Sequence, residues 1–266
     1  MRVFVRNANL PICCKSVIYG EKYADILEIP LKFLGIDSIF VPENPDVDPR
    51  LSGHADLSVL HVGGEGIFLA PYLKGSIFTE KLEALGASLR FPVQPQRADY
   101  PFDALMNVCV FGDYAILNRK TAANELVDYL TIEKKKQLIL CKQGYSRCSV
   151  CPIGREALIT ADRGIAVAAE SAGISVLLIS EGFIALDGFP HGFIGGASFM
   201  ISDHEIAFTG RLDRHPDRNR ILTFLTERHL SPVFLTEQDA FDIGSAVPIF
   251  EDYTRLPLKE DKVCFS

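Results

Sequence analysis

Three segments of the sequence repeat one local pattern, in which an apolar helix end is followed by a glycine and then by an apolar run. The segments are 33–41, 84–91 and 171–179, and their glycines are Gly35, Gly86 and Gly173. Glycine adopts the left-handed backbone that ends many helices more readily than other residues do. The pattern therefore predicts three helix C-termini, each leading into a buried strand. It recurs without glycine at 121–140 and at 216–235, where Pro216 suits the first position of a helix.

Four predicted hairpins accompany these helices. Each consists of two strand-like runs around a short polar or glycine-containing turn, and the turns are Gly63-Gly64, Gly112-Asp113, Gly154-Arg155 and Asp203-His204. The first helix has no hairpin before it, but the runs 1–6 and 243–250, at opposite ends of the chain, could pair to supply one. The sequence thus predicts five units of strand, strand, helix and strand, with the termini closing a ring.

An ordinary three-layer α/β domain is the alternative fold. Its strands are joined by crossovers and seldom by hairpins inside every unit, so the hairpins favour the ring. We expect residues 1–250 to form a single α/β domain and residues 251–266 to form a surface tail.

The charge balance limits the kinds of partner. Lys and Arg number 27 against 34 Asp and Glu, which argues against a protein that binds the nucleic-acid backbone. Glu170 and Glu181 interrupt the most apolar region, so no membrane span is expected. Seven cysteines and an N-terminus without a signal-peptide pattern predict a reduced, cytoplasmic protein.

The five-unit arrangement resembles the pentein fold, the pseudo-fivefold α/β propeller of the guanidine-modifying superfamily. That superfamily includes arginine deiminases, dimethylarginine dimethylaminohydrolases and amidinotransferases. More narrowly, the chain resembles an uncharacterised family assigned to this fold. The stretches that carry the narrower resemblance are 52–56, 100–103, 107–109, 142–149, 192–198, 215–217 and 242–245.

The superfamily resemblance implies a central channel in which a Cys thiolate attacks a guanidinium carbon, a His moves protons and acidic residues hold the cation. The sequence departs from this pattern in two places. The stretch 241–248, where the nucleophilic Cys is expected, contains none, and Gly195-Gly196 stands where a His-x-Asp motif is expected. The superfamily chemistry therefore does not follow from the fold alone.

Residues at the start of each predicted hairpin should converge on the axis of a ring. They are almost all polar or glycine: His54, Asp56, Asp103, Asn107, Tyr145, Cys148, Gly195, Gly196, Ser198, Asp242 and Ser245. Such a set could bind a polar or cationic small molecule. The alternative is that these residues only begin strands and turns, which Asp, Asn, Ser and Gly favour for local reasons.

His54 and Asp56 are two residues apart, so on a strand both side chains would point to one face. A carboxylate beside an imidazole raises the His pKa and suits general acid/base catalysis. A structural ion pair or a turn hydrogen bond would explain the same spacing.

Cys148 and Cys151 form a Cys-x-x-Cys motif. A zinc site would need two more ligands, and no second motif with ligand spacing supplies them, so no metal site is predicted. Lys142 and Arg147 could lower the pKa of Cys148 and make it a nucleophile. The alternative is that Cys148 is a buried thiol that packs as a small apolar group.

The run 192–198 invites comparison with a phosphate-binding loop. It lacks the Lys-Ser/Thr of a P-loop and leads into a strand, so close backbone packing explains its glycines better. No cofactor is expected, and His191 is placed at the rim of the pocket.

Two functions follow as hypotheses. The first is a hydrolase or transferase for a small cationic guanidine-like or amide substrate in an axial pocket, with Cys148 as nucleophile, His54 as acid/base, and Asp56 and Asp103 as charge partners. The remaining predicted substrate contacts are Asn107, Tyr145, Ser198, Asp242 and Ser245. The second is a non-catalytic module that binds a metabolite or a protein.

Overall fold

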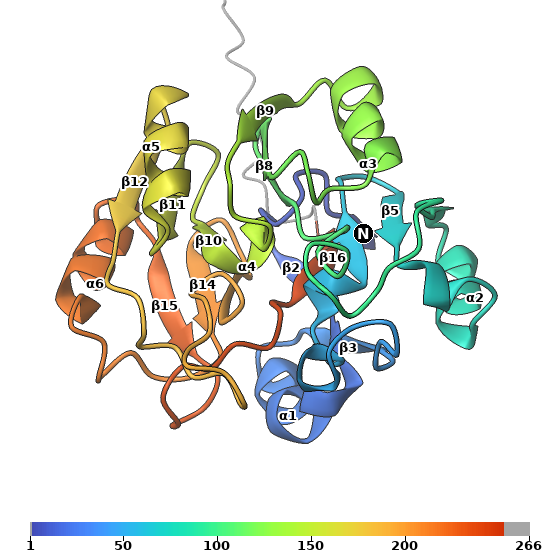
Figure 1. Cartoon of the computed structure of the whole chain (residues 1–266). Helices are drawn as coiled ribbons and strands as arrows, with labels where there is room; N and C mark the ends of the chain where they lie inside the picture. Colours follow the sequence, from blue (N-terminus) through green and yellow to red (C-terminus); the bar gives the residue numbers. More distant parts are fainter. Residues whose placement is uncertain (1, 253–266) are drawn as a thin grey trace, which may run out of the picture.

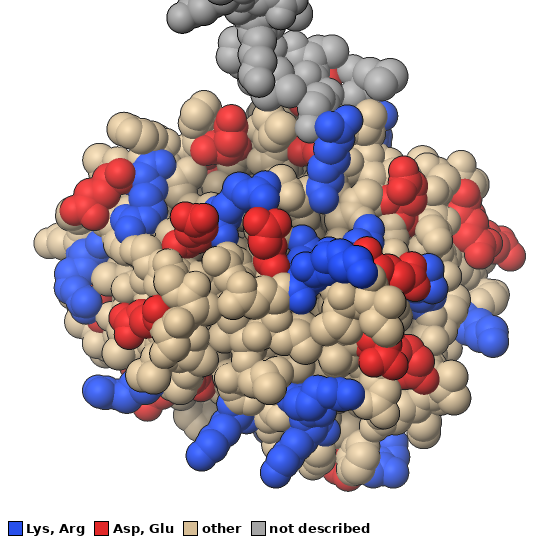
Figure 2. All heavy atoms as spheres, turned by 90° about the horizontal axis from the view of Figure 1, so that it is seen from above, with Lys and Arg blue, Asp and Glu red and all other residues tan. Residues whose placement is uncertain are grey.

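The computed structural model describes residues 2–252 and contains five small sheets in that part of the chain, surrounded by short helices. Helices α1, α2, α3, α5 and α6 lie at the periphery in Figure 1, whereas the one-turn helix α4 lies near the middle. No helix of residues 2–252 is long and apolar enough to cross a membrane. Acidic and basic side chains are interspersed over the face shown in Figure 2.

The sheets share one order of pairing. In four of them the first and second strands form an antiparallel hairpin. A helix follows the second strand, and the third strand, after the helix, pairs parallel with the second. The second unit contains β4 (Val59–His61), β5 (Gly66–Leu69), α2 (Ile77–Ala84) and β6 (Ser88–Arg90), with 3₁₀ turns η2 (Pro49–Leu51), η3 (Ala55–Leu57) and η4 (Pro71–Leu73).

The third and fourth units repeat this order. The third contains β7 (Cys109–Phe111), β8 (Tyr114–Leu117), α3 (Asn124–Asp128), the π-helical turn η5 (Tyr129–Glu133) and β9 (Gln137–Leu140). The fourth contains α4 (Ser146–Ser149), β10 (Val150–Pro152), β11 (Ala157–Thr160), α5 (Arg163–Ser171) and β12 (Ser175–Leu178).

The fifth unit contains β13 (Ser198–Met200), β14 (Glu205–Phe208), α6 (Arg218–Thr226) and β15 (Ser231–Phe234). Helix α6 begins two residues after the predicted start at Pro216. A turn precedes it, because the backbone N–H of Asp217 donates to the imidazole Nδ1 of His215 at 3.0 Å.

The first unit is completed by the C-terminal end of the described chain. It contains β1 (Arg2–Phe4), β2 (Cys14–Gly20), the 3₁₀ turn η1 (Glu21–Tyr23), α1 (Ala24–Phe33), β3 (Asp37–Val41) and β16 (Val247–Asp252). Strand β16 pairs antiparallel with both β1 and β2. The predicted pairing of the two ends is confirmed, but the strand β2 beside them was not predicted.

The predicted tail begins too early. Glu251 and Asp252 extend β16, and the buried carboxylate of Glu251 accepts hydrogen bonds from the backbone N–H groups of Arg6, at 2.9 Å, and Ile12, at 2.8 Å. These bonds hold the N-terminal segment against the end of β16. The rest of the predicted tail, 253–266, lies outside the described residues.

The left-handed residues at the helix ends explain the repeated pattern. Gly35, Gly86 and Gly173 have φ values of 72°, 91° and 85°, as predicted. In the two units without glycine, Lys135 and His229 adopt the same conformation with φ values of 53° and 57°. All five units therefore connect helix and strand through a left-handed residue. In three units this residue is glycine, which adopts the conformation without strain.

Candidate active site

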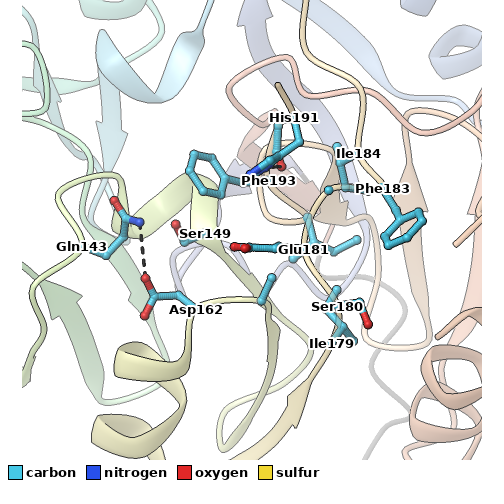
Figure 3. Close-up of a pocket in the computed structure, with 14 residues that line it drawn as sticks. Gln143, Ser149, Asp162, Ile179, Ser180, Glu181, Phe183, Ile184, His191 and Phe193 are labelled. Atoms are coloured by element: carbon cyan, nitrogen blue, oxygen red, sulfur yellow. Dashed lines mark hydrogen bonds between the residues drawn. The ribbon is translucent and has the colours of Figure 1, made fainter. Parts of the chain in front are cut away.

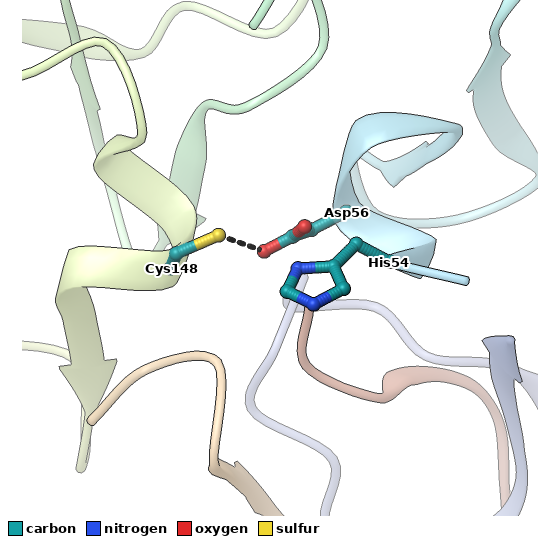
Figure 4. Close-up of side chains that lie close together, drawn as sticks. All are labelled: His54, Asp56 and Cys148. Carbon is teal, nitrogen blue, oxygen red and sulfur yellow. Dashed lines mark hydrogen bonds between the residues drawn. The ribbon is translucent and has the colours of Figure 1, made fainter. Parts of the chain in front are cut away.

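Cys148 lies on α4, immediately before β10, and its side chain is almost completely buried. Its sulfur donates a hydrogen bond to Asp56 Oδ2 at 2.7 Å (Figure 4). The same sulfur accepts a hydrogen bond from Asn107 Nδ2 at 3.2 Å. Three different units thus meet at this thiol.

Asp56 lies on the 3₁₀ turn η3, and His54 is the residue just before that turn. The prediction that both residues lie on an extended strand is wrong, since β4 begins only at Val59. The turn is held by a bond from the Leu57 N–H to the His54 carbonyl at 3.2 Å. Ligand atoms of His54, Asp56 and Cys148 nevertheless all lie within 4.8 Å of one another.

His54 is fully enclosed, with its Nδ1 3.9 Å from Asp242 Oδ1 and its Nε2 without a hydrogen-bond partner. Burial lowers the pKa of the imidazole, and the nearby Asp242 carboxylate opposes this shift. A buried imidazole with a lowered pKa is neutral at neutral pH, so His54 is able to accept a proton.

Burial and, to a smaller extent, the negative charge of Asp242 together raise the pKa of Asp56 to about 7. The Oδ1 atom of Asp56 has no hydrogen-bond partner. Burial also raises the pKa of Cys148 well above that of an ordinary thiol, and Asp56 and Asp242 add to the shift. The thiol therefore keeps its proton until a positive charge enters or a base removes it.

Asp242 is fixed by its neighbours in the chain. Its Oδ2 accepts a hydrogen bond from the Phe193 N–H at 2.8 Å, and its Oδ1 accepts one from the Gly244 N–H at 2.8 Å. A Cβ atom at Gly196 would lie 1.8 Å from Asp242 Oδ1. The glycine leaves room for the carboxylate, which confirms that close packing, not phosphate binding, requires this residue.

Asn107 positions the start of α4. Its Oδ1 accepts hydrogen bonds from the backbone N–H groups of Arg147, at 2.7 Å, and Cys148, at 3.3 Å. The Tyr145 hydroxyl donates to Asp103 Oδ2, and of these two residues Tyr145 lines the cavity described below. Burial raises the pKa of Asp103, and the hydrogen bond from Tyr145 lowers it in part.

Two predicted substrate contacts have structural roles instead. Ser198 donates its hydroxyl to the Ile194 carbonyl at 2.7 Å, and Ser245 accepts a hydrogen bond from the guanidinium of Arg147. Arg147 is buried and also donates to the carbonyls of Val150, at 3.1 Å, and Gly195, at 3.2 Å. Arg147 was predicted only to influence Cys148 along the chain, and its central structural role was missed.

A cavity of about 250 Å³ opens onto the thiol. Its inner wall contains Cys148, His54 and Asp242, and its outer wall is mostly apolar. The residues of the outer wall are Leu51, Leu57, Tyr145, Leu186, Phe189, Pro190, His191 and Phe193. No Lys or Arg of residues 2–252 lines it. A smaller cavity of about 60 Å³ shares His191 and Phe193 and extends toward Gln143 and Asp162 (Figure 3).

The Cys-x-x-Cys motif does not form a metal site. Cys151 packs in an apolar cluster with Ile153 and Ile159, whereas Cys148 lines the cavity. In residues 2–252 the one group of His, Cys and acidic side chains close enough to hold a metal ion is His54, Asp56 and Cys148. The sequence predicted that these three residues converge, but not that they form a ligand set.

The fold is similar to those of solved guanidine-modifying enzymes. An amidinotransferase from Microseira wollei, of the saxitoxin biosynthetic pathway, is 11% identical with a TM-score of 0.56, and the alignment covers 90% of this chain and 96% of that enzyme. A dimethylarginine dimethylaminohydrolase from Pseudomonas aeruginosa is 11% identical with a TM-score of 0.51, over 88% and 97%. Agmatine deiminase from C. jejuni, solved with substrate bound, is 6% identical with a TM-score of 0.55, over 94% and 96%.

These similarities confirm the mixed α/β fold of the pentein superfamily, and at this identity they establish the fold alone. No curated protein sequence matches the chain. A family model does match, over residues 18–247, which is most of the chain. The chain therefore belongs to the family described as a family of unknown function, DUF6873.

Proposed function

We propose that this protein is a hydrolase or transferase for a small cationic, guanidine-like substrate and that Cys148 is its nucleophile. The observation that carries the proposal is the buried cluster of His54, Asp56 and Cys148, whose ligand atoms lie within 4.8 Å of one another and of which His54 and Cys148 line a cavity. The thiol is within hydrogen-bond distance of a base, Asp56, at 2.7 Å. The similar solved structures named above act on guanidine compounds, which supports the substrate class.

The charge of the cavity favours a cationic substrate. Asp242 lines the cavity, and Asp56 accepts the hydrogen bond of the lining residue Cys148. The one buried cation among the described residues, Arg147, is held by three uncharged acceptors. A guanidinium group would add the missing positive charge and stabilise a Cys148 thiolate beside it.

The reaction can be followed proton by proton. The Cys148 thiol proton passes along the 2.7 Å hydrogen bond to Asp56, whose pKa of about 7 suits a base near neutral pH. The thiolate forms a bond to the guanidinium carbon, and the protonated Asp56 returns the proton to the departing amine. His54 Nε2, which has no hydrogen-bond partner among the described residues, then removes a proton from the water or amine that displaces the sulfur. The bond between sulfur and carbon breaks, and the imidazolium returns this proton to the released thiolate, which restores the starting state.

The outer wall of the cavity selects the rest of the substrate. Its apolar residues include Leu57, Leu186 and Phe189, and no Lys or Arg in the described part of the chain lines the cavity to pair with a substrate carboxylate. The nearby Arg50 stacks on Phe189 and is committed to Asp48 and to the Gly188 carbonyl. An uncharged or apolar tail therefore fits better than an amino-acid tail.

We also propose that the five units form a pseudo-fivefold propeller around Cys148. Five apolar clusters support this, since each contains residues of two sheets. Four of the clusters join successive units, and one joins the fifth unit to the first. Such an arrangement brings five distant loops to one axis, where α4 lies in Figure 1.

The non-catalytic alternative is less well supported. It would be favoured by a cavity filled with apolar side chains, whereas this cavity is open and has a thiol, an imidazole and a carboxylate in its inner wall. A small-molecule ligand is common to both hypotheses.

The test is an activity screen with matched cysteine variants. The protein is incubated with alkylguanidines, agmatine and arginine, and the release of ammonia or amine is measured. We expect turnover with at least one alkylguanidine, loss of turnover in Cys148→Ser, and turnover retained in Cys151→Ser, which changes the other cysteine of the motif outside the cavity. Turnover that survives in Cys148→Ser would reject the proposed nucleophile.

A further inference from the structure

We propose that His54, Asp56 and Cys148 together bind one zinc ion, which occupies the cavity floor in competition with the organic cation. The ion binding stands on geometry and ligand chemistry alone. Its effect on turnover rests on the proposed function.

The first argument is that the cluster contains buried polar atoms without protein partners. His54 Nε2 and Asp56 Oδ1 have no hydrogen-bond partner, although both residues are about 98% buried or more. An unpaired polar atom in such a place costs about 1–3 kcal/mol, so these atoms are ready to bind a group that enters the cavity.

The second argument is the identity of the ligands. An imidazole nitrogen, a carboxylate oxygen and a thiolate sulfur are the three types of side chain that bind zinc, and the sulfur favours zinc over the hard cations magnesium and calcium. The neighbouring carboxylates of Asp56 and Asp242, whose negative charges act on one another, also favour a divalent ion.

The third argument is geometric. Ligands of a tetrahedral zinc ion lie about 3.2–3.7 Å apart. The three ligand atoms already lie within 4.8 Å of one another, and the Sγ and Oδ2 atoms, now 2.7 Å apart, must separate by about 0.5–1 Å. Asp242 Oδ1 lies 3.9 Å from the imidazole Nδ1, so a further carboxylate stands beside the three ligands.

Of the three ligands, His54 and Cys148 line the cavity. At a pH above the Asp56 pKa of about 7, binding replaces the thiol proton with a bond from sulfur to zinc, so one proton is released for each ion bound, and no electrons are transferred. A sulfur bound to zinc is not free to attack a guanidinium carbon. Zinc would therefore act as a reversible inhibitor, removed by a chelator.

The experiment measures zinc binding to the full chain by equilibrium dialysis and titration calorimetry, with zinc sulfate as the probe, in two buffers of different ionisation enthalpy. We expect one zinc ion per chain and the release of about one proton. With cobalt(II) in place of zinc, we expect the absorption band of a thiolate bound to cobalt.

Cysteine variants separate this site from the other thiols. Cys148→Ser should lose the stoichiometric site and the cobalt–thiolate band, whereas Cys151→Ser and Cys264→Ser should keep both. Cys264 lies outside the described residues and controls for binding by the tail. A melting curve without metal confirms that each variant is folded.

The outcomes also separate the two proposals. Binding that is equal in Cys148→Ser and the unchanged chain, or the absence of stoichiometric binding to the unchanged chain, would overturn the zinc site. A chain that binds zinc as described but turns over no guanidine would retain the zinc site and lose the proposed function. A chain that binds zinc while retaining full turnover would overturn the inhibitory role.

Discussion

Arg147 provides the sharpest test of the electrostatics of the site. It is the one Lys or Arg that is buried in residues 2–252, and its guanidinium donates to the carbonyls of Val150 and Gly195 and to Ser245 Oγ. Replacing Arg147 with Met keeps much of the volume and removes the charge. The three acceptors then lose their donor, and the carboxylates of the cavity lose the positive charge that opposes them.

We expect the free energy of unfolding to fall by about 3 kcal/mol or more, because each of the three buried acceptors that loses its donor costs about 1–3 kcal/mol. The comparison is Arg155→Met. The Arg155 side chain is 55% exposed and pairs with Asp113 at the surface. Loss of a surface pair changes stability by at most about 1 kcal/mol, so burial alone distinguishes the two changes.

The pH dependence makes the prediction more specific. The pKa of Asp56 in the folded protein, about 7, is above its value in the unfolded chain, so the folded state holds the proton more tightly. This contribution to stability is complete below about pH 4 and is lost as the pH rises to about 7. Arg147 lowers the pKa of Asp56, so removal of Arg147 raises this pKa. The stability of the variant then continues to fall with rising pH above pH 7.

Urea unfolding at pH 5 and pH 8.5 measures both effects. The destabilisation by Arg147→Met should be larger at pH 8.5 than at pH 5, by about 1.4 kcal/mol for each unit by which the pKa of Asp56 rises. If Arg147→Met does not fold, Arg147→Lys, which retains the charge, should fold and show little added pH dependence. A destabilisation that is the same at both pH values would refute the coupling between Arg147 and Asp56.

Three further changes test other parts of the structure. Gly196→Ala should destabilise the chain by about 1–3 kcal/mol or prevent folding, since the added Cβ would lie 1.8 Å from Asp242 Oδ1. Urea unfolding measures this change, and an unchanged midpoint would show that Gly196 and Asp242 are not in close contact. Glu251→Gln should lower the melting temperature because a neutral amide replaces a carboxylate that holds two backbone N–H groups, with Glu205→Gln as the exposed control. Leu186→Arg should shift the ratio of kcat/KM toward arginine and away from an alkylguanidine by placing a cation at the cavity wall, and an unchanged ratio would show that this wall does not select the tail.

The five-unit fold could be predicted because its signals are local. A helix that ends in a left-handed glycine and leads into an apolar run is visible within ten residues, and so is a hairpin around a two-residue turn. The strand β2 was missed because its partner β16 lies at the other end of the chain. The strand becomes recognisable only when that long-range pairing is known.

The candidate site was only partly predictable. The repeat placed His54, Asp56 and Cys148 at equivalent positions in different units, and the structure brings them together. The local reason given for His54 and Asp56 was wrong, since His54 precedes a 3₁₀ turn and Asp56 lies on it, and neither is on a strand. Ser198 and Ser245 were expected to contact substrate, but their hydroxyl groups are used inside the protein.

The sequence by itself determined the kind of unit, the number of units and the chemical types of residue available at their starts. The tertiary structure decided which side chains face the cavity, which are enclosed, and which charges lie within a few ångströms of one another. Those properties fix the pKa values of Asp56, His54 and Cys148 through burial and through Asp242. Desolvation and Coulomb interactions depend on distance in space, and the distance between residues 56, 148 and 242 exists only once the chain has folded.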